Sequence, residues 1–128
     1  MRKWSTMTAR TIDRTANEQQ LAFISQLLRS LDPFFRIRGT MPARHVQAYL
    51  LVAQKEGLTV TELAKRADMP VTTMSRVLLD MGDRNRYFEE GAGLVEGEDN
   101  PLNRREKMYR LTPKGRALLA SMTKGALR

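Results

Sequence analysis

Apolar residues recur at intervals of three or four in several stretches of the chain, a spacing typical of helices with one buried face. The first such stripe consists of Leu21, Ile24, Leu28, Leu31 and Phe35. Asn17 precedes the stripe and can cap a helix, so we expect a helix over residues 17–38. Pro33 is expected to end or kink this helix near Leu31, because proline lacks the backbone N–H that a helix interior uses.

The next stripe predicts a second helix that starts at Pro42 and closes at Gly57. Its apolar face consists of His45, Val46, Tyr49, Leu50 and Ala53. A short third helix follows, with Thr61 as its N-cap. Thr59 and Glu62 also match a capping box, so two starting points for this helix stay open.

A fourth helix is expected from Pro70 to Met81, with Gly82 closing it. Its apolar stripe consists of Val71, Met74, Leu78 and Met81. Residues 83–93 show no period, and we interpret them as a loop or a frayed extension of the helix.

The last part of the chain predicts a hairpin and a helix. Residues 94–111 alternate between apolar and polar positions around Tyr109 and Leu111, which predicts a β-hairpin with a long tip. Thr112 followed by proline marks a helix start, and we expect a helix over residues 113–124. Its apolar face consists of Leu118, Leu119 and Met122.

These elements predict a mainly α fold with a small β-hairpin, namely a winged helix-turn-helix with an added N-terminal helix. The helix-turn-helix covers residues 42–82 and the wing covers residues 94–111. A chain of 128 residues suits one core, so residues 17–128 are expected to form a single domain. Residues 1–16 carry only scattered apolar side chains, and we interpret them as a flexible basic arm.

Composition narrows the function classes. The chain has 22 Lys and Arg against 14 Asp and Glu, a formal net charge of +8, which favours a polyanionic partner. It has no cysteine, no apolar run that could span a bilayer and no signal-peptide core, so we expect a cytoplasmic protein without a membrane partner. The only histidine, His45, has no second ligand or nucleophile at a useful spacing, so we expect neither an enzyme nor a cofactor.

The predicted fourth helix presents side chains suited to DNA. On a helical projection Thr72, Thr73 and Arg76 lie opposite the apolar stripe, with Ser75 at its margin. The major groove admits one helix, small hydroxyl side chains allow a close approach, and Arg76 can contact guanine O6 and N7 together. Threonine and serine are also ordinary capping residues, so a purely structural role stays open for this pattern alone.

The predicted hairpin adds a basic surface. Its cations, with those just after it, are Arg104, Arg105, Lys107, Arg110, Lys114 and Arg116. Only Glu106 opposes them within this stretch. Paired arginines at a wing tip suit the minor groove, where narrow A·T tracts concentrate negative potential. A solvated basic loop is the alternative.

The order of these segments resembles the MarR-type winged-helix regulators. TELAKRADMPVTTMSRVLLDM is similar to their short helix and recognition helix, and NRREKMYRLTPKGRALL to their wing. Ser75 and Arg76 match the family's Ser-Arg pair, and Arg105 matches its wing arginine. The end of the family's wing is matched by Leu111, Thr112 and Gly115. The resemblance covers roughly residues 42–122.

The resemblance implies a homodimer that places one recognition helix in each half-site of double-stranded DNA. Such proteins usually repress transcription from palindromic operators. Many release DNA on binding a small aromatic ligand, so a small-molecule effector is a candidate partner. The candidate DNA contacts are Thr61, Val71, Thr72, Thr73, Ser75, Arg76, Arg104, Arg105 and Lys107.

The sequence departs from the family's pattern in three places. Asn103 stands where the family has the aspartate that holds the wing arginine, which predicts a looser wing or one more net positive charge. The connection over residues 82–93 is longer than usual. Its Arg84, Arg86 and Tyr87 could extend the recognition surface or pad a loop, and we favour the interpretation as padding. The chain stops at Arg128, before the longer C-terminal helices that build the family's dimer. The first and last helices are then the dimer candidates, unless their stripes serve the core of the monomer.

Other function classes fit the same pattern. A winged helix can bind DNA within a replication or partition complex, or it can serve as a protein-interaction module. An interaction module would not need an arginine-rich wing, and RNA readers more often display stacking aromatics. We therefore expect a sequence-specific DNA-binding regulator, with the replication, partition and interaction roles as alternatives.

Overall fold

The computed structural model describes residues 16–83 and 90–126, which form five helices and a three-stranded antiparallel sheet. The helices are α2 (Glu18–Ile37), α3 (Ala43–Gln54), α4 (Val60–Ala67), α5 (Val71–Asp80) and α6 (Pro113–Ala126). The strands are β1 (Leu58–Thr59), β2 (Val95–Asn100) and β3 (Asn103–Leu111), in the order β1-β3-β2. The expected basic arm lies almost wholly outside the described residues.

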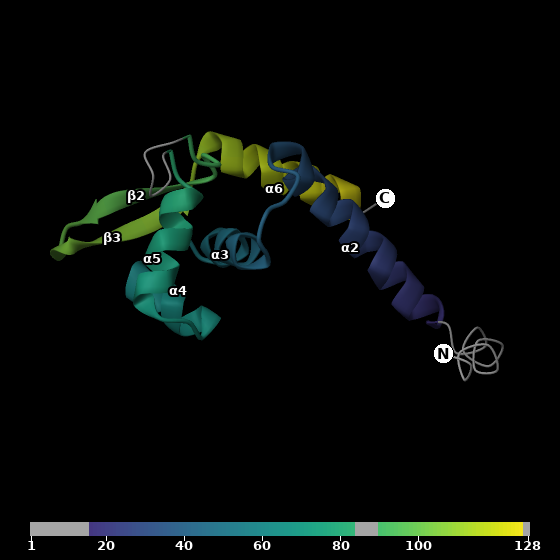
Figure 1. Cartoon of the computed structure of the whole chain (residues 1–128), viewed down its shortest axis with the longest axis horizontal. Coiled ribbons are helices and arrows are strands. Elements are labelled where there is room, and N and C mark those ends of the chain that lie inside the picture. Colours follow the sequence, from purple (N-terminus) through teal and green to yellow (C-terminus); the bar gives the residue numbers. More distant parts are fainter. Residues whose placement is uncertain (1–15, 84–89, 127–128) are drawn as a thin grey trace.

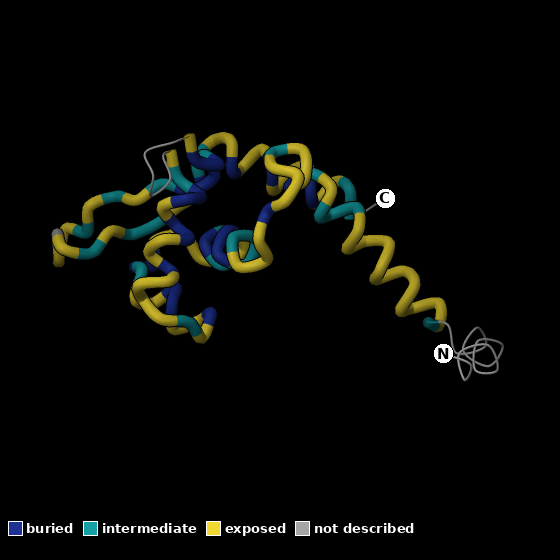
Figure 2. Tube along the Cα trace, in the orientation of Figure 1, coloured by how far each residue is buried: buried dark blue, intermediate teal, exposed yellow. Residues whose placement is uncertain are grey.

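The predicted fold class, a winged helix-turn-helix with an added N-terminal helix, is confirmed. Helices α3, α4 and α5 pack on one another, and α3 and α4 also contact β3. Strands β2 and β3 form the wing, which lies with α4 and α5 at one end of the molecule (Figure 1). Helix α6 leaves the base of the wing and packs along α2. The N-terminal part of α2 projects away from the body of the molecule and is exposed (Figure 2).

The elements meet at Tyr49 in the middle of α3. Tyr49 is fully buried, and its ring meets that of Phe34 in α2 edge-on, with centroids 5.3 Å apart and planes at 85°. Its hydroxyl donates a hydrogen bond of 2.6 Å to the Gly115 carbonyl in α6. Burial raises the pKa of Tyr49 to about 12, so the hydroxyl keeps its proton at neutral pH and can donate it. Tyr49 therefore holds α2 and α6 against the helix-turn-helix.

Helix α2 starts where predicted, but Pro33 does not end it. The Asn17 side chain accepts the Gln20 N–H, and the Gln20 side chain accepts the Asn17 N–H, each at 2.9 Å. The helix continues through Pro33 for one more turn to Ile37, close to the predicted end at residue 38. Of the two outcomes expected at Pro33, an end or a kink, the end is therefore wrong. We attribute this to Phe34, because burying its ring against Tyr49 offsets the backbone hydrogen bond that proline removes.

Most of the apolar stripe of α2 remains exposed in the monomer. Its exposed large side chains are Leu21, Phe23, Ile24, Leu27, Leu28 and Phe35, each at least 44% accessible. Leu31 packs partly against the core, and Phe34 is buried. The alternative that the apolar side chains of α2 all pack in the core of the monomer is therefore wrong for the described part of α2.

The start of α4 resolves the choice between two capping residues. Thr59 is the N-cap, because its hydroxyl accepts the Glu62 N–H at 3.2 Å. Thr61 consequently lies inside the helix, and its prediction as the cap is wrong. Helix α3 already ends at Gln54, and Gly57, with φ 98°, forms the turn that leads into β1. Strand β1 is a two-residue strand, too short to show a period in the sequence.

The helix-turn-helix also has an exposed residue in each of two predicted apolar stripes, Leu50 in α3 and Val71 in α5. Val71 is 43% accessible and Leu50 is 42% accessible. The buried face of α5 is formed by Met74, Val77 and Leu78. Successive helical residues are about 100° apart, so Val71 falls at the margin of that face rather than in it. Its place in the core stripe is therefore a correction.

The two ends of the connection over residues 82–93 lie close together at the C-terminal end of α5. The Gly91 N–H donates to the Asp83 carbonyl at 2.9 Å. A Cβ atom on Gly91 would lie 2.2 Å from the Gly82 carbonyl oxygen, so this approach requires glycine. The interpretation of this connection as padding concerns residues 84–89, which lie outside the described residues, and it stays a prediction.

Helix α6 begins at the predicted cap. The Thr112 hydroxyl accepts the Gly115 N–H at 3.0 Å and donates to the Gly93 carbonyl at 2.6 Å. Leu118 and Met122 are buried, whereas Leu119, predicted on the same face, is exposed. None of the helices in residues 16–83 and 90–126 is both long and apolar enough to cross a membrane.

Gly115→Ala should destabilise the fold. A Cβ atom there would lie 2.1 Å from the Leu94 carbonyl oxygen, so the backbone would have to shift. We expect a loss of about 1–3 kcal/mol in the free energy of unfolding, measured by urea denaturation. Gly39→Ala is the matched control, because nothing lies within 4 Å of its Cβ position, and it should change stability by less than about 0.5 kcal/mol. Equal stability of the two variants would contradict the close contact.

Candidate nucleic-acid interface

The turn between α4 and α5 is built from local backbone chemistry. Glu62 completes the cap of α4 by accepting the Thr59 N–H at 3.1 Å. Its hydrogen bonds to the Thr59 backbone and side chain lower the pKa of Glu62, which keeps it charged at the positive end of the helix. Helix α4 ends at Asp68, whose φ of 53° is a left-handed conformation that aspartate tolerates. Pro70 then leads into α5 in an extended conformation.

The first turn of α5 lacks the side-chain cap that α4 has. Its N-cap residue is Pro70, which provides no side-chain hydrogen bond. The first backbone N–H groups of α5 therefore have no side-chain acceptor, and the positive end of the helix dipole favours an anion. These uncapped N–H groups could bind an anion only together with the side chains around them.

The side chains predicted to contact DNA share the exposed surface of α5. The exposed polar residues are Thr72, Thr73, Ser75 and Arg76. Within the described part of the chain, none of the four side chains has a hydrogen bond or an ion pair to another residue. Val71 lies beside them at the first turn and is also partly exposed. The structure thus brings five of the predicted contacts together on a surface that the fold itself does not use.

The other end of α5 is fixed by a polar contact with α3. Asp80 is buried, and its carboxylate lies 3.2 Å from Nε2 of His45. Both side chains are largely shielded from solvent, with 11% and 15% of their surfaces accessible. The sequence places His45 at the boundary of a helix rather than at a catalytic site, and here it holds the exposed helix in position.

Asparagine side chains shape the tip of the wing. The side-chain oxygen Oδ1 of Asn100 accepts the Leu102 N–H at 3.0 Å, and Oδ1 of Asn103 accepts the Arg105 N–H at 3.1 Å. Asn103 therefore holds the backbone of Arg105. Leu102 at the tip is 96% accessible.

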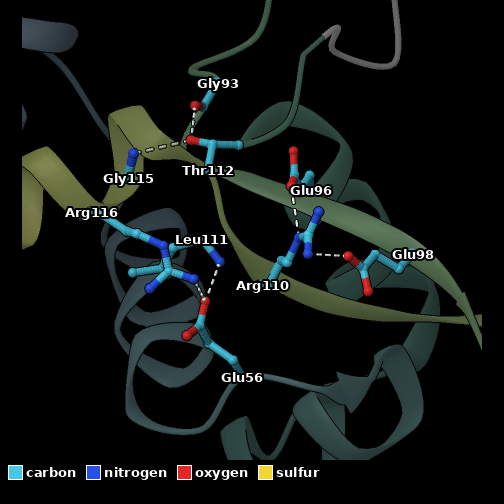
Figure 3. A network of polar contacts seen from close by, with 9 residues as sticks. All are labelled: Glu56, Gly93, Glu96, Glu98, Arg110, Leu111, Thr112, Gly115 and Arg116. Carbon is cyan, nitrogen blue, oxygen red and sulfur yellow. Dashed lines mark hydrogen bonds and ion pairs between the residues drawn. The ribbon is translucent and has the colours of Figure 1, made fainter.

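Carboxylates outside the predicted basic run neutralise two of its arginines (Figure 3). The Arg110 guanidinium contacts Glu96 at 2.7 Å and also contacts Glu98. The hydrogen bond to Glu96 raises the pKa of Arg110. Arg116 contacts Glu56 at 2.7 Å. Glu106 is the only acidic residue within the basic stretch of the sequence, but the fold brings glutamates from outside the stretch against two of its arginines.

The other predicted DNA contacts, Thr61 in α4 and three cations of the wing, differ in their surroundings. The Thr61 hydroxyl donates to the Glu106 carboxylate, so Thr61 links α4 to β3. The aliphatic stem of Lys107 lies over Gly97, where a Cβ atom would come within 2.9 Å of it. The side chain of Arg105 is exposed and has no partner among the described residues. The side chain of Arg104 lies outside what the structure describes.

Several features of this surface have no signal in the sequence. The pairing of Arg110 with Glu96 follows from their positions opposite each other in the hairpin, a register that the sequence pattern had not defined. Leu79, 48% accessible, lines an open hollow of about 570 Å³ between α5 and the wing, together with Tyr109. In residues 16–83 and 90–126, no group of three or more histidine or acidic side chains could hold a metal ion.

Glu56→Ala should destabilise the base of the wing. The Glu56 carboxylate accepts both the Leu111 N–H, at 2.9 Å, and the Arg116 guanidinium (Figure 3). We expect a loss of about 1–2 kcal/mol in the free energy of unfolding, measured by urea denaturation. Glu56→Gln keeps an acceptor for the Leu111 N–H and should lose less. If both substitutions were neutral, the carboxylate would have no structural role.

Comparison with known proteins identifies the fold. No protein-family model matches the sequence, and no curated protein matches it. Rv1404 from Mycobacterium tuberculosis matches with a TM-score of 0.67 and 16% identity, over 88% of this chain and 77% of that chain. The apo form of MarR from E. coli matches with a TM-score of 0.58 and 19% identity, over 87% and 77%.

A third solved structure includes DNA. The transcriptional repressor CouR, bound to a 23-mer DNA duplex, matches with a TM-score of 0.58 and 24% identity, over 85% of this chain and 70% of that chain. Sequence identities at this level establish the architecture rather than the ligand or the operator. This chain therefore has the winged helix-turn-helix fold of the MarR-type transcriptional regulators.

Proposed function

We propose that this chain is a sequence-specific DNA-binding transcriptional regulator that inserts α5 into the major groove. The observation that carries the proposal is the exposed polar surface of α5, whose hydroxyl and guanidinium groups have no partner among the described residues. Ten residues make α5 about 15 Å long, and the major groove admits a helix of this kind. Arg76 would contact guanine, and Thr72 and Thr73 would contact phosphates or base edges.

The position of the wing supports the same proposal. The wing and α5 lie at the same end of the molecule (Figure 1), so one duplex can contact both. Arg105 is the wing arginine that we assign to this role, because its side chain is exposed and has no carboxylate partner among the described residues, whereas Arg110 is paired with Glu96. Its backbone is held by Asn103, which adds no negative charge next to it. Arg105 would enter the minor groove beside the helix.

The proposal includes a homodimer that represses transcription from a palindromic operator. The apolar stripe of α2 supports dimer formation, because a monomer leaves these side chains in water. CouR, whose solved structure with DNA has a similar fold, is a transcriptional repressor, and this similarity supports repression. We propose no enzymatic activity, and control by a small-molecule effector stays a prediction.

Selection of bound sequences from a random duplex library tests the proposal most directly. We expect an inverted repeat with one half-site for each α5, and an affinity that falls steeply with salt because phosphate contacts release counterions. Light scattering at micromolar concentration should show a dimer. Binding without any preferred sequence would contradict the regulator. A monomer without a palindrome would instead favour a replication, partition or protein-interaction role.

Arg76→Ala should relax the base preference at one position of each half-site and cost about 1–3 kcal/mol of binding free energy. The reason is that Arg76 is the only guanidinium on the exposed surface of α5. The measurement is a titration of labelled duplexes that differ at single base pairs. Arg38→Ala, an exposed arginine just beyond α2, is the control and should leave the base preferences unchanged.

Arg105→Ala should weaken binding at every site, and most at sites with A·T-rich flanks. Narrow A·T minor grooves concentrate negative potential, so a cation inserted there contributes more than at G·C flanks. Titrations on duplexes with matched A·T and G·C flanks would measure this, and the slope of affinity against salt should fall as well. An unchanged affinity would remove Arg105 from the interface.

A further inference from the structure

Val71 and Ser75 form one edge of the exposed surface of α5. The two residues are four apart in the helix, so their side chains are neighbours with Cβ atoms about 5–6 Å apart. Val71 presents two methyl groups and is 43% accessible. Ser75 presents a hydroxyl group on an exposed residue. This edge therefore combines an apolar contact with a hydrogen-bonding group.

Neither side chain has a structural role in the described chain. The core side of α5 is supplied by Met74, Val77 and Leu78. Hydroxyl groups within helices often donate back to the preceding turn, as Ser30 does to the Gln26 carbonyl at 2.8 Å. Ser75 makes no such bond and has no other partner within residues 16–83 and 90–126.

Thymine is the base whose major-groove edge matches this pair. It presents a C5-methyl group next to the O4 acceptor, whereas adenine, guanine and cytosine present no methyl group there. Valine methyl groups can pack on the thymine methyl, and the serine hydroxyl can donate to O4. We propose that Val71 and Ser75 together read one thymine in the sequence that each α5 occupies. This inference rests on the proposed DNA-binding function and deepens it.

The helix also sets where this thymine lies relative to the guanine proposed for Arg76. Val71 and Arg76 are five residues apart in α5. This corresponds to about 7.5 Å along the helix axis, close to the span of two base-pair steps of about 3.4 Å each. The thymine and the guanine should therefore lie about two or three base pairs apart in each site.

Leu79 provides a matched control on the same helix. It is an exposed aliphatic side chain like Val71, 48% against 43% accessible. It lies at the other end of α5, however, and lines the hollow beside the wing. Its removal should therefore leave recognition of the thymine methyl unchanged.

The experiment uses the full chain and a duplex obtained by selection, in which each thymine is replaced in turn by deoxyuridine. This replacement removes the methyl group and keeps O4. For the wild type, we expect one replacement per site to lower affinity about 3–10-fold, the effect of losing one buried methyl contact. Val71→Ala should bind the thymine duplex more weakly by a similar factor and should no longer distinguish thymine from deoxyuridine. Leu79→Ala should keep the wild-type discrimination.

A second comparison tests Ser75. Replacing the same thymine by 5-methylcytosine, paired with guanine, keeps the methyl group and exchanges O4 for an amino group. Ser75→Ala should lose much of the preference for thymine over 5-methylcytosine while keeping the penalty for deoxyuridine. Circular dichroism of each variant checks that α5 remains folded, and Val71→Thr, which keeps the branched shape, should retain part of the discrimination.

The outcomes separate this inference from the function on which it rests. If selected duplexes bind tightly but no deoxyuridine replacement lowers affinity, the thymine reading is wrong and DNA binding stands. The same holds if Val71→Ala keeps the full penalty. If the wild type binds no duplex, the proposed function fails and the thymine reading fails with it.

Discussion

The burial of Tyr49 is the contact on which the rest of the structure depends. Its ring anchors the C-terminal part of α2 through Phe34, and its hydroxyl anchors α6 through the Gly115 carbonyl. Because α6 starts at the base of the wing, the same contact also sets the wing relative to the helix-turn-helix. Within residues 16–83 and 90–126, the N-terminal turns of α2 have no such anchor, and their apolar side chains remain exposed.

The fold divides the basic residues into two groups. Arg110 and Arg116 hold the wing and its base together through carboxylates on neighbouring elements. Arg76 and Arg105 have no partner within the described chain. A net positive charge alone does not make this distinction, because paired and unpaired cations contribute equally to it. The unpaired group indicates where a polyanion would bind.

Local chemistry explains which predictions succeeded. The cap at Asn17 and the helix start at Thr112 depend on residues within four positions of each other, and the structure confirms both. Predictions that needed knowledge of neighbours in space failed. Helix α2 continues through Pro33 because Phe34 is buried against another helix. Val71 is exposed because the core contacts α5 from a slightly different direction than the stripe indicates.

The sequence by itself determined the order of the elements, most of their ends and the candidate surface of α5, because helical periodicity and capping are local properties. It also indicated the winged-helix architecture through the order of its motifs. The tertiary structure decided which cations are neutralised, that Thr61 is held by Glu106, and that Val71 is exposed rather than packed in the core. These features depend on strand register and on contacts between residues far apart in the chain, which no local pattern encodes.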